Sequence, residues 1–195
     1  MAENNHSNSL PLGEGWGGAD SYPSGEGRGG AASHITYSPI GFFKTDYTPE
    51  TGGPRQGVLR PNGKGEIHIY DQYKDALRYI VLFEYIIVLY HFNEAGQWES
   101  YVNPPSANHK HDFGLFSTRS PKRPNPIGFS IIKLERIEND ILYVSGVDAF
   151  DGSPVLDIKP YLPSIDCIKS RQNEQVEVDL GHHDEDFITD KKFYK

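Results

Sequence analysis

The sequence predicts a mainly β domain, folded as a small closed or partly closed β-barrel with short helices. Several short segments rich in apolar and β-branched residues follow one another at close spacing, and loops rich in Pro and Gly separate them. No Gly-x-Gly-x-x-Gly motif follows any of these segments, which argues for a non-Rossmann fold. The length of 195 residues suits one such domain with tails.

Composition divides the chain into three parts. Residues 1–34 contain eight Gly and few apolar residues, so they bury too little surface to offset chain entropy and are predicted to form a disordered tail. Residues 35–167 hold the apolar segments and form the predicted barrel domain. Residues 168–195 are polar and acidic and are predicted to be a second tail. Within this tail, residues 175–180 alternate between apolar and polar side chains, a pattern that also fits an edge strand.

Periodicity and composition place the expected strands. Residues 65–70 alternate between apolar and polar side chains, as in a half-buried strand, and residues 80–92 have the composition of the central, most buried strand. Asp71 is predicted to cap a short helix that runs to residue 80. Asn139 and Asp140 predict a hairpin turn. The other expected strands cover residues 35–44, 113–117, 127–137, 141–147 and 155–158.

The composition also indicates the cellular compartment of the protein. The mean hydropathy of −0.58 and the hydrophobic fraction of 36% fit a water-soluble protein. The N-terminus lacks the basic stretch and apolar core of a secretory signal, and the longest apolar run is shorter than the roughly 20 residues of a membrane span. Cys167 is the single cysteine, so an intrachain disulfide cannot form, and a cytoplasmic protein is predicted.

Charge is distributed unevenly along the chain. The formal net charge of −8 argues against a general affinity for nucleic acid. Residues 109–136 nevertheless hold six Lys or Arg against two Asp or Glu, and such a locally basic segment can contact a phosphate. His109 and His111 lack further ligands at metal-binding spacing, so no metal site is predicted.

Two polar segments stand out between the expected strands. Residues 117–128 read STRSPKRPNPIG, and residues 148–160 read DAFDGSPVLDIKP. Each combines charged residues with Pro and Gly, a composition that excludes an ordinary helix or a core strand. Rigid loops on a β scaffold are where binding and catalytic residues gather, so both segments are predicted to belong to a site.

These segments also carry a resemblance to a known family. TRSPKRPNPIG followed by DAFDGSPVLDIKPYLP, together with SPIG at 38–41 and GPRQ at 53–56, resembles the signature of the TsaA-like family, also called TrmO. The resemblance covers about residues 35–166. It implies a small β-barrel that binds S-adenosylmethionine and methylates tRNA. The implied acceptor is N6 of a threonylcarbamoyl-modified adenosine beside the anticodon.

The resemblance further implies where the cofactor is bound. The contacts are expected on the PRQ motif (Pro54, Arg55 and Gln56), at the end of the 80–92 strand (Phe92 and Asn93) and on the TRS arginine (Arg119). Further contacts are expected on the aromatic residue after PIG (Phe129) and on the DGSP turn (Asp151, Gly152, Ser153 and Pro154). An arginine can pair with the ligand carboxylate, and aromatic rings can wall its adenine. The chain departs from the family at two places. The family usually has the sequence SHLW where residues 84–87 read EYII, and it commonly has a histidine at the position of Asn93.

Several roles remain open from the sequence. Asp151 and Asp148 are both candidates for a base that removes the proton from the urea-like acceptor nitrogen. Lys110, Lys122 and Arg123 are predicted to contact tRNA phosphates or the threonyl carboxylate. A homodimer is predicted from the resemblance and from the long Pro-containing loop before residue 110. The alternative function is a non-catalytic module that binds S-adenosylmethionine as a sensor or interaction partner.

Overall fold

A computed structural model describes residues 35–103 and 112–168 of the chain. The chain divides into two units, residues 1–36 and 37–195, and all strands described below belong to the second. The tail predicted at 1–34 lies outside the described residues, as does the tail predicted at 168–195 apart from its first residue, and so does Lys110.

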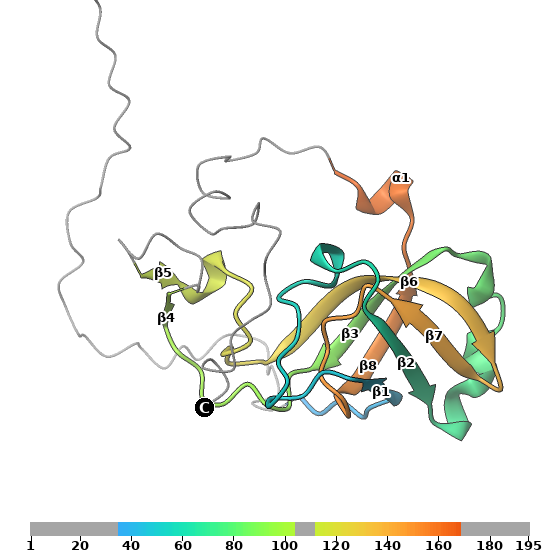
Figure 1. Ribbon diagram of the computed structural model, residues 1–195, viewed down its shortest axis with the longest axis horizontal. Coiled ribbons are helices and arrows are strands. Elements are labelled where there is room, and N and C mark those ends of the chain that lie inside the picture. The colour runs from blue at the N-terminus through green and yellow to red at the C-terminus, as the bar shows by residue number, and fades with distance from the viewer. Residues whose placement is uncertain (1–34, 104–111, 169–195) are drawn as a thin grey trace, which may run out of the picture. The chain divides into compact units, whose positions relative to one another are not determined.

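Within the described ranges, six strands close into a barrel, as the sequence predicts (Figure 1). Neighbours around the barrel follow the order β1, β2, β7, β6, β3, β8, and each neighbouring pair is antiparallel. Because β1 also pairs with β8, the barrel sheet has no free edge. The strands are β1 (Gly41–Thr45), β2 (Lys64–Ile69), β3 (Tyr85–His91), β6 (Ile127–Glu138), β7 (Ile141–Ser145) and β8 (Pro154–Pro160).

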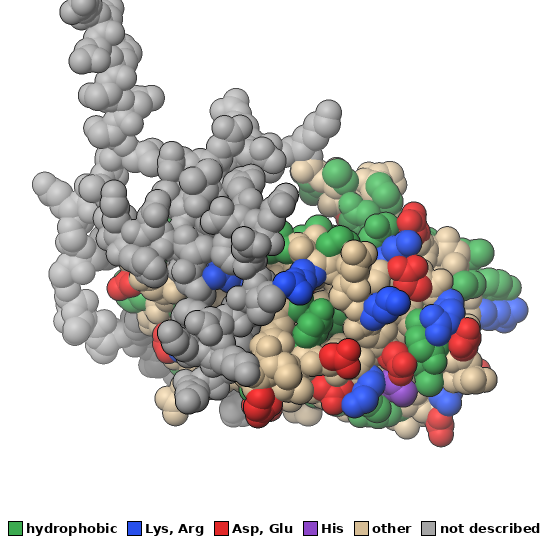
Figure 2. Space-filling view, in the orientation of Figure 1, with side chains coloured by type: hydrophobic (Ala, Val, Ile, Leu, Met, Phe, Trp, Pro, Cys, Tyr) green, Lys and Arg blue, Asp and Glu red, His purple; other side chains and the backbone are tan. Residues whose placement is uncertain are grey.

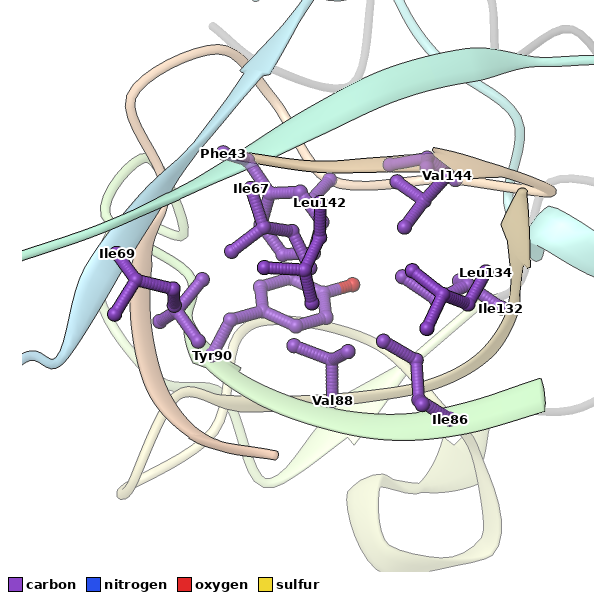
Figure 3. Close-up of a cluster of buried hydrophobic side chains, with 13 residues drawn as sticks. Phe43, Ile67, Ile69, Ile86, Val88, Tyr90, Ile132, Leu134, Leu142 and Val144 are labelled. Atoms are coloured by element: carbon purple, nitrogen blue, oxygen red, sulfur yellow. The ribbon is translucent and has the colours of Figure 1, made fainter. Parts of the chain in front are cut away.

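Apolar side chains that alternate along the strands fill the barrel interior. On β3, Ile86, Val88 and Tyr90 are buried, whereas the residues between them are half-buried on the outer face. Figure 3 shows the Tyr90 ring inside this cluster, and Phe43 meets it edge to face with ring centres 5.4 Å apart. The prediction of one central strand is wrong, because a closed barrel has no centre and β3 alternates like its neighbours.

The β6–β7 hairpin turns at the two residues that predicted it. Asn139 and Asp140 have φ values of 51° and 62°, as in a type I′ turn, whose twist matches that of the flanking strands. Strand β6 is twelve residues long, so it reaches from the Pro-rich segment at 117–126 to this hairpin. It therefore connects the two ends of the barrel.

The segment after β2 differs from the single capped helix that was predicted. It contains two 3-10 helices, η2 (Asp71–Leu77) and η3 (Ile80–Leu82). Asp71 is the first residue of η2 and pairs with Lys74 at 2.8 Å, so it does not act as the cap. Tyr79 adopts a left-handed φ of 71° between the two helices. Because the chain turns there, β3 begins at Tyr85 and not at residue 80.

Other bounds also differ from the sequence predictions. Strand β1 begins at Gly41 and not at residue 35, since Pro39 has no amide N–H to donate to a sheet. The predicted loop at 94–110 contains β4 (Tyr101–Val102), which pairs with β5 (Phe113–Gly114). Strand β5 is shorter than expected because residues 115–117 form the 3-10 helix η4 (Leu115–Ser117).

Two further helices complete the described elements, η1 (Gly57–Leu59) and α1 (Pro163–Asp166). No helix within residues 35–103 and 112–168 has the length and apolar character needed to cross a membrane. Cys167 follows α1 and is an exposed free thiol.

A methyl group added at Gly128 is expected to destabilise the barrel. A Cβ there would lie 2.4–2.7 Å from ring atoms of Tyr90, so the ring would have to move within a packed interior. We expect Gly128→Ala to lower the free energy of unfolding by about 1–3 kcal/mol in urea titrations. The matched control is Gly114→Ala, whose Cβ would meet nothing within 4 Å and which should change stability by less than about 1 kcal/mol. Equal effects of the two substitutions would contradict this packing.

Candidate functional site

Asp148, three residues beyond β7, is the polar centre of the candidate site. Its Oδ1 atom accepts hydrogen bonds from Ser130 Oγ at 2.5 Å and from the Tyr90 hydroxyl at 3.2 Å. Its Oδ2 atom accepts one from the Gly57 amide at 3.2 Å. Since Tyr90 lies on β3, Ser130 on β6 and Gly57 at the start of η1, one carboxylate joins three separate elements.

The surroundings of Asp148 alter its acidity. Burial raises the pKa of this carboxyl above its ordinary value, because the charged form loses solvation. The hydrogen bonds from Ser130, Gly57 and Tyr90 act in the opposite direction and offset part of that rise. A carboxyl with a raised pKa binds a proton more readily than one in water, which suits a general base.

The segment that carries the PRQ motif is held from two sides. Asp148 binds the Gly57 amide, and Gln56 Oε1 accepts a hydrogen bond from Arg119 Nη1 at 2.5 Å. A Cβ at residue 57 would lie 1.7 Å from the Gly146 carbonyl oxygen, so only glycine allows this close approach. Pro54 is buried and Arg55 is half-buried. The structure thus brings the PRQ motif and the TRS arginine together, although 63 residues separate Gln56 from Arg119.

The end of β3 meets the DGSP turn. Ser153 Oγ donates a hydrogen bond to Asn93 Oδ1 at 3.3 Å, and Gly152 provides the left-handed φ of 75° that the turn requires. The Phe92 ring packs edge to face on Tyr90 with centres 5.2 Å apart, and the Phe92 amide donates to the carbonyl of Pro126 at 2.8 Å. Four of the segments named from the sequence are therefore linked by direct contacts.

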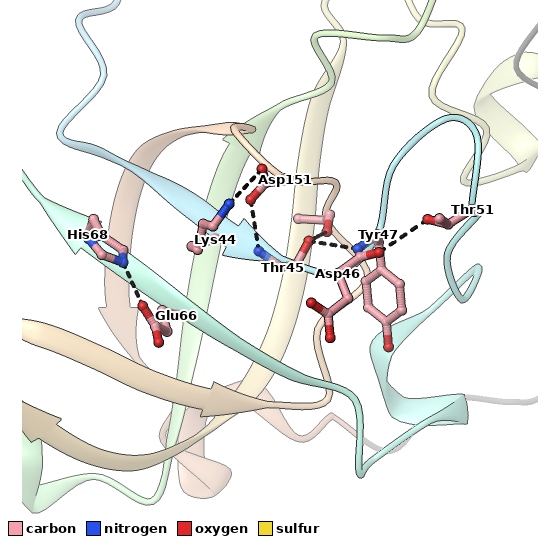
Figure 4. Close-up of polar contacts among 9 residues, drawn as sticks. Lys44, Thr45, Asp46, Tyr47, Thr51, Glu66, His68 and Asp151 are labelled. Atoms are coloured by element: carbon pink, nitrogen blue, oxygen red, sulfur yellow. Dashed lines mark hydrogen bonds and ion pairs between the residues drawn. The ribbon is translucent and has the colours of Figure 1, made fainter.

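Asp151 occupies a different environment from Asp148. Its Oδ1 atom accepts a hydrogen bond from the Thr45 amide at 3.0 Å, and its Oδ2 atom pairs with Lys44 Nζ at 3.1 Å (Figure 4). Burial alone would raise the pKa of the Asp151 carboxyl, but the Thr45 amide and the Lys44 ammonium outweigh it and hold this pKa below its ordinary value. These contacts make Asp151 an anchor between the DGSP turn and β1.

The cationic side chains that were predicted to contact tRNA also interact with other groups of the protein. Lys122 Nζ lies 2.6 Å from Glu99 Oε1, and Arg123 donates to the Thr118 carbonyl at 3.0 Å. Arg119 is exposed, and its Nη1 hydrogen bond to Gln56 leaves further guanidinium donors facing solvent. Within residues 35–103 and 112–168, no group of three His, Cys, Asp or Glu side chains is placed to hold a metal ion.

Phe129 and Ser130 point to opposite sides of β6. Ser130 is buried and reaches Asp148, whereas Phe129 is 46% exposed on the outer face. Phe129 was predicted from the sequence to be a site residue, whereas Ser130 and Tyr90, which contact Asp148, were not. One signal was present, since Ser130 shares its face with the apolar Ile132 and a polar residue in that position needs a buried partner.

These observations define a class of protein: a small antiparallel β-barrel with a candidate ligand site, built from loops around one partly buried carboxylate. Comparison with known proteins narrows the class. Residues 42–167 match the model of the tRNA-methyltransferase O N-terminal domain, so the chain belongs to this family.

Individual relatives agree with this assignment. The chain is 41% identical over 137 residues to an S-adenosyl-L-methionine-binding protein of Archaeoglobus fulgidus, covering 70% of this chain and 96% of that protein. It is 36% identical to the tRNA (adenine(37)-N6)-methyltransferase of Escherichia coli, covering 67% of this chain and 59% of the enzyme. A crystal structure of TrmO superposes with a TM-score of 0.61 at 33% identity, covering 72% of this chain and 63% of that one. The chain thus spans less than two thirds of the last two proteins.

Asp148→Asn and Asp151→Asn are expected to change the pH dependence of folding in opposite directions. The raised pKa of Asp148 gives stability that is complete below the ordinary aspartate value of about 3.9 and is lost as the pH rises through the raised value. The lowered pKa of Asp151 gives stability that is present above about 3.9 and is lost as the pH falls through the lowered value.

Urea titrations of the wild type and both variants between about pH 3 and pH 7 measure this difference. The stability advantage of the wild type over Asp148→Asn should shrink as the pH rises, and its advantage over Asp151→Asn should grow. If both advantages moved in the same direction, the assigned environments of the two carboxyls would be wrong.

Proposed function

We propose that the chain is an S-adenosylmethionine-dependent methyltransferase that acts on N6 of adenosine 37 in tRNA when this adenosine carries a threonylcarbamoyl group. The observation that carries the proposal is the convergence of the PRQ segment, Arg119 and Asp148 in a barrel of this family. The relative in Archaeoglobus fulgidus is an S-adenosyl-L-methionine-binding protein and that in Escherichia coli a tRNA (adenine(37)-N6)-methyltransferase, which supports the cofactor and the reaction. We also propose that the protein acts in the cytoplasm, where tRNA is available as a substrate.

The side chains at the site suit the functional groups of S-adenosylmethionine. Arg119 offers guanidinium donors for a carboxylate, and the oxygens of Asn93 and Ser153 can accept from an ammonium group or a ribose hydroxyl. Phe92 offers an aromatic wall at the same end of β3. When bound, the cofactor supplies a methyl group that its sulfonium already activates. The protein therefore has to align the acceptor and exclude water.

Asp148 is the better of the two candidate bases. Its Oδ2 atom accepts a hydrogen bond from the Gly57 amide, and a carboxylate oxygen has a second lone pair that could take the proton of the acceptor nitrogen. Burial raises the pKa of Asp148, whereas Thr45 and Lys44 hold the pKa of Asp151 low despite its own partial burial. Asp148 would take the N6 proton as the nitrogen attacks the methyl carbon. The sulfur of the cofactor would leave with the electron pair of the C–S bond in the same step as the C–N bond forms.

Arg119→Ala is expected to weaken binding of S-adenosylmethionine by about 10- to 100-fold, the scale of one hydrogen bond to a charged group. The substitution removes a guanidinium donor and also releases Gln56. Isothermal titration calorimetry measures the dissociation constant. Arg78→Ala serves as a control, because Arg78 is an exposed residue whose guanidinium packs on the Tyr79 ring. An unchanged affinity in Arg119→Ala would remove this residue from the cofactor site.

Single-turnover transfer of labelled methyl from S-adenosylmethionine to tRNA tests the reaction itself. We expect transfer to tRNA that carries the threonylcarbamoyl group and none to the same tRNA without it. Asp148→Asn should slow transfer by about 10²- to 10⁴-fold, the usual share of a general base, and Asp151→Asn should slow it much less. Equal transfer to both tRNAs would contradict the assigned acceptor. Cofactor binding without transfer to either would favour the sensor or interaction module.

We further propose that two copies of the chain form a homodimer through the outer face of β6. Ile127, Phe129 and Ile131 leave 41%, 46% and 38% of their surface exposed along this strand, next to outward-facing apolar residues of β3. Sedimentation at micromolar concentration should give twice the 21.9 kDa chain mass. Ile131→Glu should yield the monomer, whereas Ile165→Glu, at an exposed position of α1, should not. A monomeric wild type would exclude the proposal.

A further inference from the structure

A groove is lined by residues that have no part in the methyl transfer described above. Its volume is about 600 Å³. Two segments form its walls, the residues that follow β1 and the chain between η1 and the start of β2. The lining residues are Asp46, Tyr47, Leu59, Arg60, Pro61, Asn62, Gly63 and Lys64.

The polar groups of the groove are of both signs. Arg60 and Lys64 are exposed, and neither forms an ion pair among the residues that the structure describes. Asp46 is exposed as well, and Figure 4 shows its carboxylate and the Tyr47 ring on the same side of the chain after β1. A Cβ at Gly63 would lie 2.5 Å from the Tyr47 hydroxyl, so this ring packs directly against the opposite wall.

We propose that this groove binds the ribose–phosphate backbone of tRNA beside the methylated nucleotide, an inference that rests on the proposed function. Phosphate oxygens only accept hydrogen bonds, and Arg60 and Lys64 are donors with a full positive charge. The ribose 2′-hydroxyl is a donor, and the Asp46 carboxylate is an acceptor for it. The alternation of anionic and hydroxyl groups along RNA therefore matches the mixed charge of the groove, whereas DNA lacks the hydroxyl.

The position of the groove fits this role. Arg60 follows Gly57 by three residues and its amide donates to the Gly57 carbonyl at 2.9 Å, so the Arg60 backbone lies next to the residue whose amide Asp148 binds. An RNA strand whose target base reached Asp148 would thus place a neighbouring phosphate at the groove.

The surface charge makes such local cations necessary. The formal net charge is −8, and Figure 2 shows Lys and Arg side chains interspersed with Asp and Glu over the visible face. The described residues visible there do not form a broad positive patch that would attract RNA. Affinity for the backbone then depends on individual cations in the right place, and the groove holds two of them.

Titration of fluorescently labelled tRNA anticodon stem-loop tests the groove. We expect Arg60→Ala and Lys64→Ala each to weaken binding by about 3- to 10-fold near 100 mM salt and to reduce the salt slope by about 0.7–1. The matched control is Lys74→Ala, because Lys74 lies beyond the other end of β2 and pairs with Asp71 and Asp140. It should bind as the wild type does. Wild-type affinity and slope in Arg60→Ala and Lys64→Ala would overturn the proposal.

A second measurement tests the recognition of ribose. Wild-type protein should bind the RNA stem-loop more tightly than its 2′-deoxy counterpart, and Asp46→Ala should reduce this ratio while leaving calorimetric binding of S-adenosylmethionine unchanged. An unchanged ratio would remove Asp46 from backbone recognition. The outcomes also separate this groove from the proposed reaction. If the groove variants bound the stem-loop more weakly but the wild type transferred no methyl group, only the proposed reaction would be contradicted. If the wild type transferred the methyl group and the groove variants bound the stem-loop as the wild type does, only the proposed role of the groove would be contradicted.

Discussion

One carboxylate, that of Asp148, sets the arrangement of the whole site. It lies where β3, β6 and the PRQ segment approach one another, and it accepts a hydrogen bond from each of them. A buried charge is costly unless donors surround it, so the three donors and the carboxylate depend on one another. The tight contact of Gly57 with Gly146 brings the amide close enough to take part. The loop that is proposed to hold the cofactor is therefore fixed to the barrel wall at this point.

The two aspartates of the DAFD sequence show how three residues of separation can change the chemistry of a side chain. Asp148 is surrounded by neutral donors in a poorly solvated position, which favours proton uptake. Asp151 faces an ammonium group and a backbone amide, which favour the ionised form. Composition alone treats them as equivalent. Their environments differ because the first side chain contacts Tyr90 and Ser130 and the second contacts Thr45 and Lys44 of β1.

The sequence predicted the barrel well and the centre of the site only in part. Alternation and turn chemistry located β2, β6, β7 and the hairpin at Asn139 and Asp140, because these features are local. The 3-10 helices and the short β4–β5 pair left no comparable periodic signal. Tyr90 and Ser130 were missed because their convergence on Asp148 depends on strand pairing across the barrel, which no local pattern records.

Closure of β1 against β8 also has a consequence for how the chain reaches its folded state. The Gly57 amide and the Asp148 carboxylate are 91 residues apart, and the first strand of the barrel finds its second neighbour only in the last strand. Contacts of such high sequence separation have to overcome loop-closure entropy before they stabilise anything, and proteins dominated by them fold in about milliseconds to seconds. During synthesis, the PRQ segment would therefore wait without its anchor until almost the entire barrel had left the ribosome.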